Sequence, residues 1–477
     1  MKITLFPYFL LLPVMLHCQQ HTISFTSSDT ALQRAFNWAK ATAMNYRGDT
    51  ADAVGPWYEA ALPARNAFCI RDAAHQSVAA ELLGMHKENR NMFGKFFAAI
   101  AASRDWCSYW EIDKWNRPAP VDYQNDSAFW YNLNANFELL YTAERLYRWT
   151  GDTYYIHHPG ILHFFEKTLH EYIRAWKLQP DSLLTRDPLP NKRSNYQVHN
   201  NYTGYRGIPS YVESVDGLRM SVDLVAAICR GFYSYAFVLQ KNGSEKNRRQ
   251  YKQLAAMYRQ HINSKWWDTA TKSYRAYLLE NGKSGPGEGV LFLLWYDVAG
   301  DSVQKTAVVN QLESESLNVE SMSYLPFLLY KNGYDILARK YLLHLSDPAT
   351  SRREYPEVSF GVIDGLIRGL MGIEADAASN TIRSYYKEEK QVNVKVDDMP
   401  ALGSVFSISH SGPQCSVFVN KGLVPVKWQA CFGGRHSLIE VNGKAIKPAT
   451  GVGNGGRLYS FVTVTVKPGA AITAIVK

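Results

Sequence analysis

The chain has 477 residues and a formal net charge of +9 at pH 7, with 46% hydrophobic and 13% aromatic residues. This length exceeds the usual size of one domain, and the hydrophobic content is sufficient for a large core, which excludes a mainly disordered protein. The sequence contains no basic helix and no RNA-binding motif, so nucleic acid is not expected as a partner.

Residues 1–18 have the pattern of an export signal. Lys2 precedes an apolar run over residues 3–16, which is too short to span a bilayer comfortably. Cys18 follows this run where a lipoprotein signal has its acylated cysteine, although His17 stands where a small residue is preferred. We therefore expect an exported bacterial protein, either periplasmic or a lipoprotein anchored to the membrane through Cys18 alone.

Helical periodicity dominates residues 24–375 and predicts twelve helices. They are expected at 30–45, 70–84, 88–103, 127–149, 155–175, 215–240, 245–266, 287–298, 302–314, 319–331, 334–346 and 358–372. Short turns such as Gly151-Asp152-Thr153 alternate with connections that are mostly long. This alternation predicts six helical hairpins arranged as an (α/α) toroid, with the long loops on one face, around the N-termini of the inner helices.

The pattern of apolar residues changes after residue 375. Residues 376–390 are polar and are expected to form a linker. Residues 391–477 contain period-two apolar runs and a turn at Asn442-Gly443, which predict a small antiparallel β-sandwich. From Ala401 onward there are eight basic residues and one acid, either a solubilising surface or an attraction to an acidic glycan.

The six cysteines include no Cys-x-x-Cys pair, which argues against a zinc site. Bridges between Cys69 and Cys107 or between Cys415 and Cys431 are weaker alternatives than buried free thiols. We expect no metal and no cofactor.

The long loops concentrate carboxylates, arginines and aromatic side chains. Aromatic faces stack on the C–H faces of sugars, whereas Arg, Asn and carboxylates bind hydroxyls. Glycoside hydrolysis also needs two carboxyl groups that flank the bond, one protonated and one ionised. The pattern therefore indicates a carbohydrate site.

Asp72 is the leading candidate for a catalytic carboxyl, and Glu213 is its expected partner. Glu59 and Glu357 are reserves. Asp72, Glu213 and Glu357 adjoin predicted helix starts, so favourable interaction with the helix dipole is the alternative explanation for each. The residues expected to bind substrate are Tyr58, Arg65, Arg71, Trp106, Trp110, Glu111, Trp115, Tyr202, Arg206 and Arg353. The three tryptophans have rim packing as their alternative.

Residues 353–373, which read REYPEVSFGVIDGLIRGLMGI, resemble the closing helix of six-hairpin glycosidases, and of α-L-rhamnosidases in particular. Residues 63–72 resemble the acidic first motif of the same enzymes, although Asn66, Ala67 and Phe68 replace its acids. The resemblance implies the toroid and a glycosidase activity. Related toroids include hydrolases that release uronic acids, a substrate that the basic charge and loop arginines also suit.

The sequence therefore predicts an exported, exo-acting glycoside hydrolase that releases a terminal sugar, either a uronic acid or a rhamnose-like sugar, from an oligo- or polysaccharide. One alternative is a polysaccharide lyase using Tyr202, Tyr205 or His199 for proton abstraction. The other is a glycan-binding lipoprotein without activity.

Overall fold

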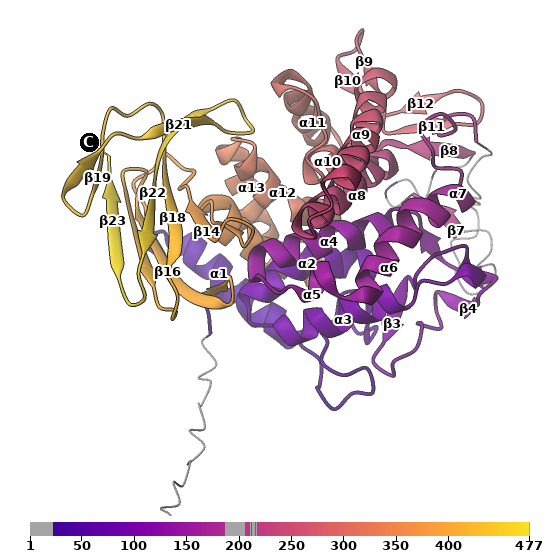
Figure 1. The fold of residues 1–477 in the computed structure, drawn as a ribbon, viewed down its shortest axis with the longest axis horizontal. Helices are drawn as coiled ribbons and strands as arrows, with labels where there is room; N and C mark the ends of the chain where they lie inside the picture. The colour runs from indigo at the N-terminus through magenta and orange to yellow at the C-terminus, as the bar shows by residue number, and fades with distance from the viewer. Residues whose placement is uncertain (1–21, 187–205, 210, 212–214, 216, 477) are drawn as a thin grey trace, which may run out of the picture.

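The computed structural model describes residues 22–186, 206–209, 211, 215 and 217–476. Most of the chain before residue 373 is helical (Figure 1). Its α-helices are α1 Thr30–Asn45, α2 Ile70–Leu82, α3 His86–Ala98, α4 Asn134–Thr150, α5 Tyr154–His157, α6 Pro159–Lys167, α7 Ile173–Ala175, α8 Val222–Lys241, α9 Glu245–His261, α10 Leu291–Trp295, α11 Ser302–Ser314, α12 Val319–Lys331, α13 Asp335–Ser346 and α14 Pro356–Asp364.

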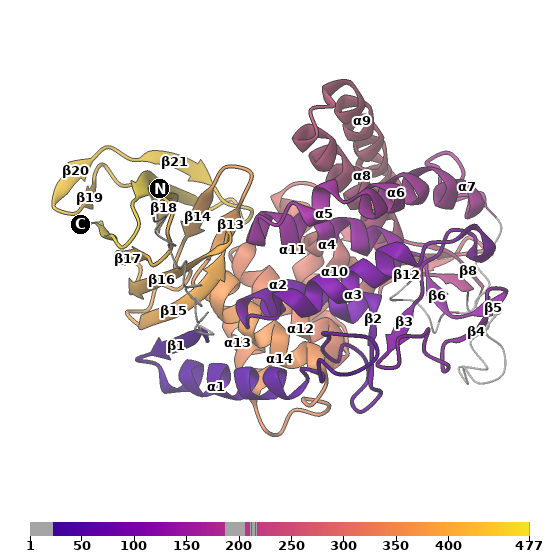
Figure 2. The same ribbon diagram turned by 60° about the horizontal axis from the view of Figure 1, so that its bottom comes forward.

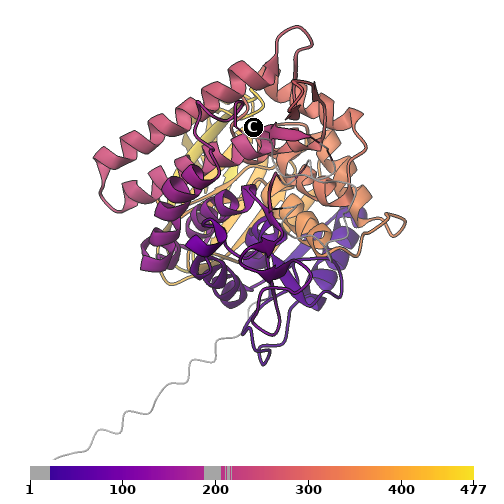
Figure 3. The ribbon, with the colours of Figure 1, turned by 90° about the vertical axis from the view of Figure 1, so that its right-hand side faces the viewer.

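One set of helices forms a closed series of neighbours. Helix α2 contacts α4, α4 contacts α8, α8 contacts α10, α10 contacts α12, α12 contacts α14, and α14 contacts α2. Helices α1, α3, α9, α11 and α13 each contact a member of this series. Figure 3 shows the helices following one another around a centre in chain order.

Several helix starts follow directly from local sequence. Asp301 and Gln304 form a capping box at α11, and the Asn318 side chain accepts a hydrogen bond from the Ser321 N–H at the start of α12. Pro356 occupies the first position of α14, where its missing N–H leaves no bond unmade.

The predicted helices are present, with four local corrections. Residues 218–221, expected inside the helix 215–240, form strand β8 Leu218–Ser221, so helix α8 begins at Val222. Residues 128–132, expected inside a helix, form strands β5 Ala128–Phe129 and β6 Tyr131–Asn132. The helix expected over 155–175 is divided into α5, α6 and α7, with a π-helical turn over Thr168–Tyr172. Further π-helical turns cover Ile262–Trp266 and Gly365–Leu370, and 3₁₀ turns cover Ala102–Arg104 and Glu288–Val290. Apolar periodicity does not distinguish these turns from α-helix.

The C-terminal part contains two facing sheets, beside the helices (Figure 2). Phe418 in one sheet stacks on Trp428 in the other, with 5.5 Å between ring centroids. The seven-stranded sheet has the order β1-β15-β16-β17-β23-β19-β20, and the five-stranded sheet the order β13-β14-β18-β22-β21. Their bounds are β1 Ser24–Ser27, β13 Glu374–Asp376, β14 Thr381–Ser384, β15 Asn393–Ala401, β16 Ser404–Ser411, β17 Cys415–Asn420, β18 Val426–Gly433, β19 Ile439–Val441, β20 Lys444–Ile446, β21 Ala449–Val452, β22 Leu458–Val466 and β23 Ala471–Ile475.

Three strands, β1, β13 and β14, extend this region beyond its expected bounds. Strand β1, at the beginning of the described chain, pairs antiparallel with β15. Strand β14 lies inside the segment expected as a linker, 376–390, and pairs parallel with β18. The sheet region is therefore antiparallel except at this pair, and residues 381–384 lie in the sheet between β13 and β18 rather than in a free linker.

Short strands also occur among the connections between helices. They are β2 Ala67–Cys69, β3 Glu111–Asp113, β4 Tyr123–Asn125, β7 Arg206–Ile208, β8 Leu218–Ser221, β9 Trp267–Asp268, β10 Ser273–Tyr274, β11 Tyr277–Leu279 and β12 Ser284–Gly285. Helix α8 is long and apolar enough to cross a membrane, but 89% of its most apolar window is buried inside the structure. It is therefore a core helix. The expected signal, 1–18, including Cys18, lies outside the described residues.

Candidate active site

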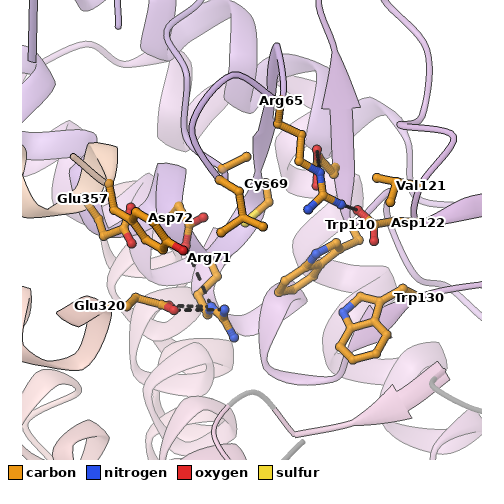
Figure 4. Close-up of a pocket in the computed structure, with 14 residues that line it drawn as sticks. Arg65, Cys69, Arg71, Asp72, Trp110, Val121, Asp122, Trp130, Glu320 and Glu357 are labelled. Carbon is orange, nitrogen blue, oxygen red and sulfur yellow. Dashed lines mark hydrogen bonds and ion pairs between the residues drawn. The ribbon is translucent and has the colours of Figure 1, made fainter. Parts of the chain in front are cut away.

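The N-terminal turns of three adjacent helices bring carboxyl groups to one pocket. Asp72 lies in the first turn of α2, Glu320 in that of α12 and Glu357 in that of α14. All three line a pocket of about 270 Å³ (Figure 4). A first-turn carboxylate interacts favourably with the positive end of the helix dipole, so the fold itself holds these acids in place.

The second wall of the pocket comes from the loop after α3. Strand β2 pairs with β3, with Cys69 opposite Glu111. The Ile70 N–H at the start of α2 donates to the Trp110 carbonyl at 3.0 Å. Figure 4 shows the indoles of Trp110 and Trp130 across the pocket from Asp72, Glu320 and Glu357. Flat aromatic rings thus face a cluster of acids, which is the mixture that a sugar site requires.

Arg71 links two of the three carboxylates. Its Nε lies 2.8 Å from Glu320 Oε1 and 3.8 Å from Asp72 Oδ1. A second guanidinium nitrogen donates to Glu320 Oε2 at 3.2 Å, and the Tyr211 hydroxyl donates to Glu320 Oε1 at 2.9 Å. The guanidinium lies 5.5 Å from the Trp110 ring centroid and 5.0 Å from that of Tyr211. One ion pair and one hydrogen bond from Arg71, with one hydrogen bond from the Tyr211 hydroxyl, hold the Glu320 carboxylate in place.

The surroundings of Asp72 and Glu357 raise the pKa of both carboxyl groups. Burial, followed by repulsion from Glu320, raises the pKa of Asp72 to about 7, although Arg71 acts against the shift. Burial, followed by the charges of Asp72 and Glu320, raises the pKa of Glu357 well above its usual range. Close carboxyl groups with little solvent cannot all ionise, so protons remain on the more buried ones. Asp72 and Glu357 can therefore hold protons closer to neutral pH than ordinary carboxyl groups do.

A second acidic pair lies deeper along the aromatic wall. Arg65 pairs with Glu111 at 3.0 Å and with Asp122 at 3.0 Å. Burial, and then the charge of Asp122, raises the pKa of Glu111 well above its usual range, and burial raises that of Asp122. The two carboxyls share a hydrogen bond. They therefore hold one proton between them beneath a single guanidinium.

Six of the residues predicted from sequence line this pocket: Asp72, Glu357, Arg65, Arg71, Trp110 and Glu111. The Glu111 carboxyl, predicted as a substrate contact, pairs with Arg65. These side chains come from the first, second and last of the long loops. The expectation that these loops meet at the N-termini of the inner helices agrees with their position.

Five other candidates lie elsewhere. Tyr58 is fully buried and its hydroxyl donates to Asn89 Oδ1 at 2.7 Å, so it is a core residue rather than a sugar contact. Glu59 accepts a hydrogen bond from the Asn66 N–H at 2.9 Å and fixes the turn before β2. The five residues that do not line the pocket are Tyr58, Glu59, Trp106, Trp115 and Arg353.

Trp106 packs against the core with Lys167 over its ring, and Trp115 is 54% exposed between Lys114 and Arg117. Arg353 lies over the Trp38 ring, with its guanidinium carbon 4.0 Å from the centroid. The stacking platform predicted from the three tryptophans is thus wrong for two of them, because a loop sequence does not show which side of the loop faces inward.

Four candidates lie outside the described residues: Glu213, Tyr202, His199 and Tyr205. Arg206 contributes its backbone to β7, which pairs with β6.

The sequence reasoning missed Glu320, Asp122 and Trp130 as pocket residues. Glu320 is not among the candidates named from the sequence, yet it lies in the first turn of α12 and also lines the pocket. The available signal was its equivalence to Asp72 and Glu357, since all three occupy the first turn of a helix in the closed series.

No protein-family model and no curated protein sequence matches the chain. Solved structures do. The α-L-rhamnosidase from Dictyoglumus thermophilum matches 96% of this chain at 12% identity with a TM-score of 0.57. The GH78 family rhamnosidase of Bacillus sp. GL1 matches 83% at 12% identity with a TM-score of 0.55. A third structure, from the human microbiome, carries the name of a kojibiose phosphorylase and matches 93% at 10% identity with a TM-score of 0.55.

These likenesses confirm the predicted structural resemblance to six-hairpin glycosidases. At this level of identity they show the fold alone. The chain spans 50%, 40% and 63% of the three solved chains, so it corresponds to part of each.

Proposed function

We propose that residues 24–375 form a six-hairpin (α/α) toroid with an active site at the N-terminal ends of its inner helices. The closed series α2-α4-α8-α10-α12-α14 supports this architecture, as does the likeness to the solved rhamnosidases. The acids of α2, α12 and α14 then lie at one mouth of the ring, where the long loops surround them.

The protein acts, in this proposal, as an exo-acting glycoside hydrolase. The observation that carries it is the pairing of Asp72, whose pKa burial and Glu320 raise to about 7, with Glu320, which Arg71 and Tyr211 hold in the same pocket. Two carboxyl groups in different surroundings, one of them able to donate a proton near neutral pH, are the arrangement that acid–base glycosidases use. A pocket of about 270 Å³ suits the end of a glycan chain better than its middle.

The roles follow from these surroundings. Asp72 donates its proton to the glycosidic oxygen, so the leaving sugar departs as an alcohol. Glu320 is the ionised group that assists attack at the anomeric carbon. Trp110 and Trp130 offer stacking surfaces for the sugar ring, and Glu357, protonated, donates a hydrogen bond to a sugar hydroxyl.

The charge of the pocket favours a neutral terminal sugar, such as a rhamnose-like one, over a uronic acid. Five carboxyl groups line it against two arginines, and both arginines are already paired, Arg65 with Glu111 and Asp122, and Arg71 with Glu320. A substrate carboxylate would have to compete for these guanidinium groups and would face the remaining acids.

We further propose that the protein is exported and acts on an oligo- or polysaccharide outside the cytoplasm. The N-terminal sequence supports this through Lys2 and the apolar run before Cys18. Labelling of the intact protein with a radioactive fatty acid in a bacterial host, compared with Cys18→Ser, distinguishes a lipid anchor from a cleaved signal.

A release assay tests the function. The protein is incubated with a panel of aryl glycosides that includes the rhamnoside and the glucuronide, and products are identified by NMR. Release of a free neutral sugar supports the proposal. An ultraviolet-absorbing unsaturated product would instead identify a lyase, and saturable binding without release would identify a glycan-binding protein.

A further inference from the structure

A second pocket, of about 370 Å³, lies at the opposite ends of the same helices. It is lined by Val78 on α2, Trp149 on α4 and Lys331 on α12, which all lie in the C-terminal halves of their helices. Its charged lining consists of five cations and three carboxylates: Arg145, Arg148, Arg230, Lys331, Arg368, Glu144, Glu374 and Asp376. The balance of charge is therefore the reverse of that in the acidic pocket.

Arg145 is the central feature of this second pocket. Its residue is 7% exposed, and one guanidinium nitrogen donates to the Ala74 carbonyl at 3.0 Å. No carboxylate among the described residues forms an ion pair with it, and its buried Nη2 has no hydrogen-bond partner there. Burial, reinforced by the charge of Arg368, lowers the pKa of Arg145 to about 10. An unpaired buried cation is costly, so a counter-charge from outside the protein would be favourable here.

The neighbouring cations add to this excess of positive charge. Arg230 and Arg148 both pair with Glu144, Arg148 also pairs with Asp376 at 3.0 Å, and Arg230 leaves its Nε without a hydrogen-bond partner among the described residues. Arg368 pairs with Asp364 at 2.9 Å and likewise leaves its Nε unbonded. The Tyr141 ring lies 5.4 Å from the Arg145 guanidinium carbon and 4.4 Å from that of Arg230. Both guanidinium groups thus lie against the same aromatic ring at the pocket.

Placement at helix C-termini explains only some of these residues. Arg148, Lys331 and Arg368 lie in last turns, where cations interact favourably with the helix dipole. Arg145 precedes the last turn of α4, and Arg230 lies in the middle of α8. Neither has that explanation, and Arg145 is buried while Arg230 is half-buried.

We infer that this pocket is an oxyanion-binding site, with Arg145 and Arg230 as its principal ligands and Lys331 at its mouth. Guanidinium groups bind carboxylate, sulfate and phosphate oxygens through pairs of N–H groups, which is the chemistry missing at the unbonded nitrogens. The volume admits either a small inorganic anion or an acidic sugar that carries such a group. The site is separate from the proposed catalytic pocket and does not depend on the reaction there.

Isothermal titration calorimetry of the full chain tests the inference. The ligands are sodium sulfate, sodium phosphate and sodium glucuronate, and chloride keeps the ionic strength constant. We expect saturable binding of at least one of these anions and a matching rise in the melting temperature. Binding of phosphate and sulfate alone identifies an inorganic ligand, whereas tighter binding of glucuronate identifies an acidic sugar.

Arg145→Gln should weaken this binding at least about tenfold, because removing one partner of a buried ion pair costs more than one tenfold step in affinity. Lys331→Gln, at the partly exposed mouth, tests the site should Arg145→Gln not fold, and should weaken binding by a smaller factor. Arg249→Gln makes the same charge change at a side chain that is 73% exposed on α9 and should leave the affinity unchanged.

Asp72→Asn should also bind the anion as the wild type does, which separates failure of this inference from failure of the proposed function. Equal effects of all salts at one ionic strength would overturn the inference. Unaltered binding in both Arg145→Gln and Lys331→Gln would overturn it too.

Discussion

Asp72 and Glu320 face one another across a single guanidinium, with Arg71 Nε 3.8 Å from Asp72 Oδ1 and 2.8 Å from Glu320 Oε1. The two carboxyl oxygens can be no farther apart than the sum of these distances. The asymmetry of the distances matters more than their size, because the arginine stabilises charge on Glu320 more than on Asp72. One pair of acids from two helices is thereby divided into a proton donor and an ion.

The first prediction concerns the pH dependence of catalysis. Asp72 must be protonated to act as the acid, and its pKa is raised to about 7. We expect kcat/KM to fall as pH rises above about 7, because Asp72 then loses its proton. A pH–rate profile on a neutral aryl glycoside measures this fall. A profile that still rises beyond pH 8 would contradict the role of Asp72.

The second prediction concerns stability. The folded-state pKa of Asp72 is raised from 3.8 to about 7, so the folded protein holds this proton more tightly than the unfolded chain does. The associated stability is present below pH 4 and is lost as pH rises toward 7. Asp72→Asn removes this loss. Its melting temperature relative to the wild type should therefore be higher at pH 8 than at pH 4.

Differential scanning calorimetry of both proteins at the two pH values measures this difference. Glu313→Gln, an acid outside the acidic pocket, provides the control and should show no such trend. An equal offset between Asp72→Asn and the wild type at pH 4 and pH 8 would mean that Asp72 has an ordinary pKa.

The third prediction concerns Arg71. Its charge lowers the pKa of Asp72, so Arg71→Gln should raise the pKa of Asp72 further. The pH optimum should shift upward, and activity at pH 7 should fall by about tenfold to a hundredfold, within the usual contribution of acid–base groups. Arg71→Lys retains a charge and should shift the optimum less. An unchanged optimum in Arg71→Gln would exclude the proposed clamp.

The fourth prediction distinguishes the tryptophans. Trp110 lines the acidic pocket, whereas Trp115 is 54% exposed on another side of the same loop. Trp110→Ala should raise KM about threefold to tenfold, which corresponds to the loss of one aromatic stacking contact. Trp115→Ala should leave kcat/KM within about twofold of the wild-type value, as at most surface positions. Initial rates over a range of substrate concentrations test both variants, and the reverse order would contradict the assignment.

The helices, and the strands of the C-terminal region, were predictable from the sequence because their apolar periods are long and regular. The connections between the helices were less predictable. Residues 128–132 continue an apolar pattern into a helix yet pair as strands, and β1 joins a sheet formed more than 360 residues later in the chain. Such pairing depends on tertiary contacts that no local pattern records.

The candidate site, like the fold, was predictable only in part from the sequence. A carboxylate at the start of a helix is visible in sequence, so Asp72 and Glu357 were found. The sequence does not show which helices pack side by side in the closed series. It therefore did not bring Glu320, another first-turn acid, to the same site. Tyr58 shows the reverse error, since a loop aromatic can point into the core.

The most direct test of the proposed function compares three proteins on one substrate. Wild type, Asp72→Asn and Glu320→Gln are incubated with a neutral aryl glycoside or oligosaccharide from which the wild type releases a terminal sugar, and release is followed by NMR. We expect both variants to be slower by at least about a hundredfold, because each lacks one acid–base group, while their melting temperatures show that they remain folded. Release at the wild-type rate by either folded variant would contradict the proposed pair.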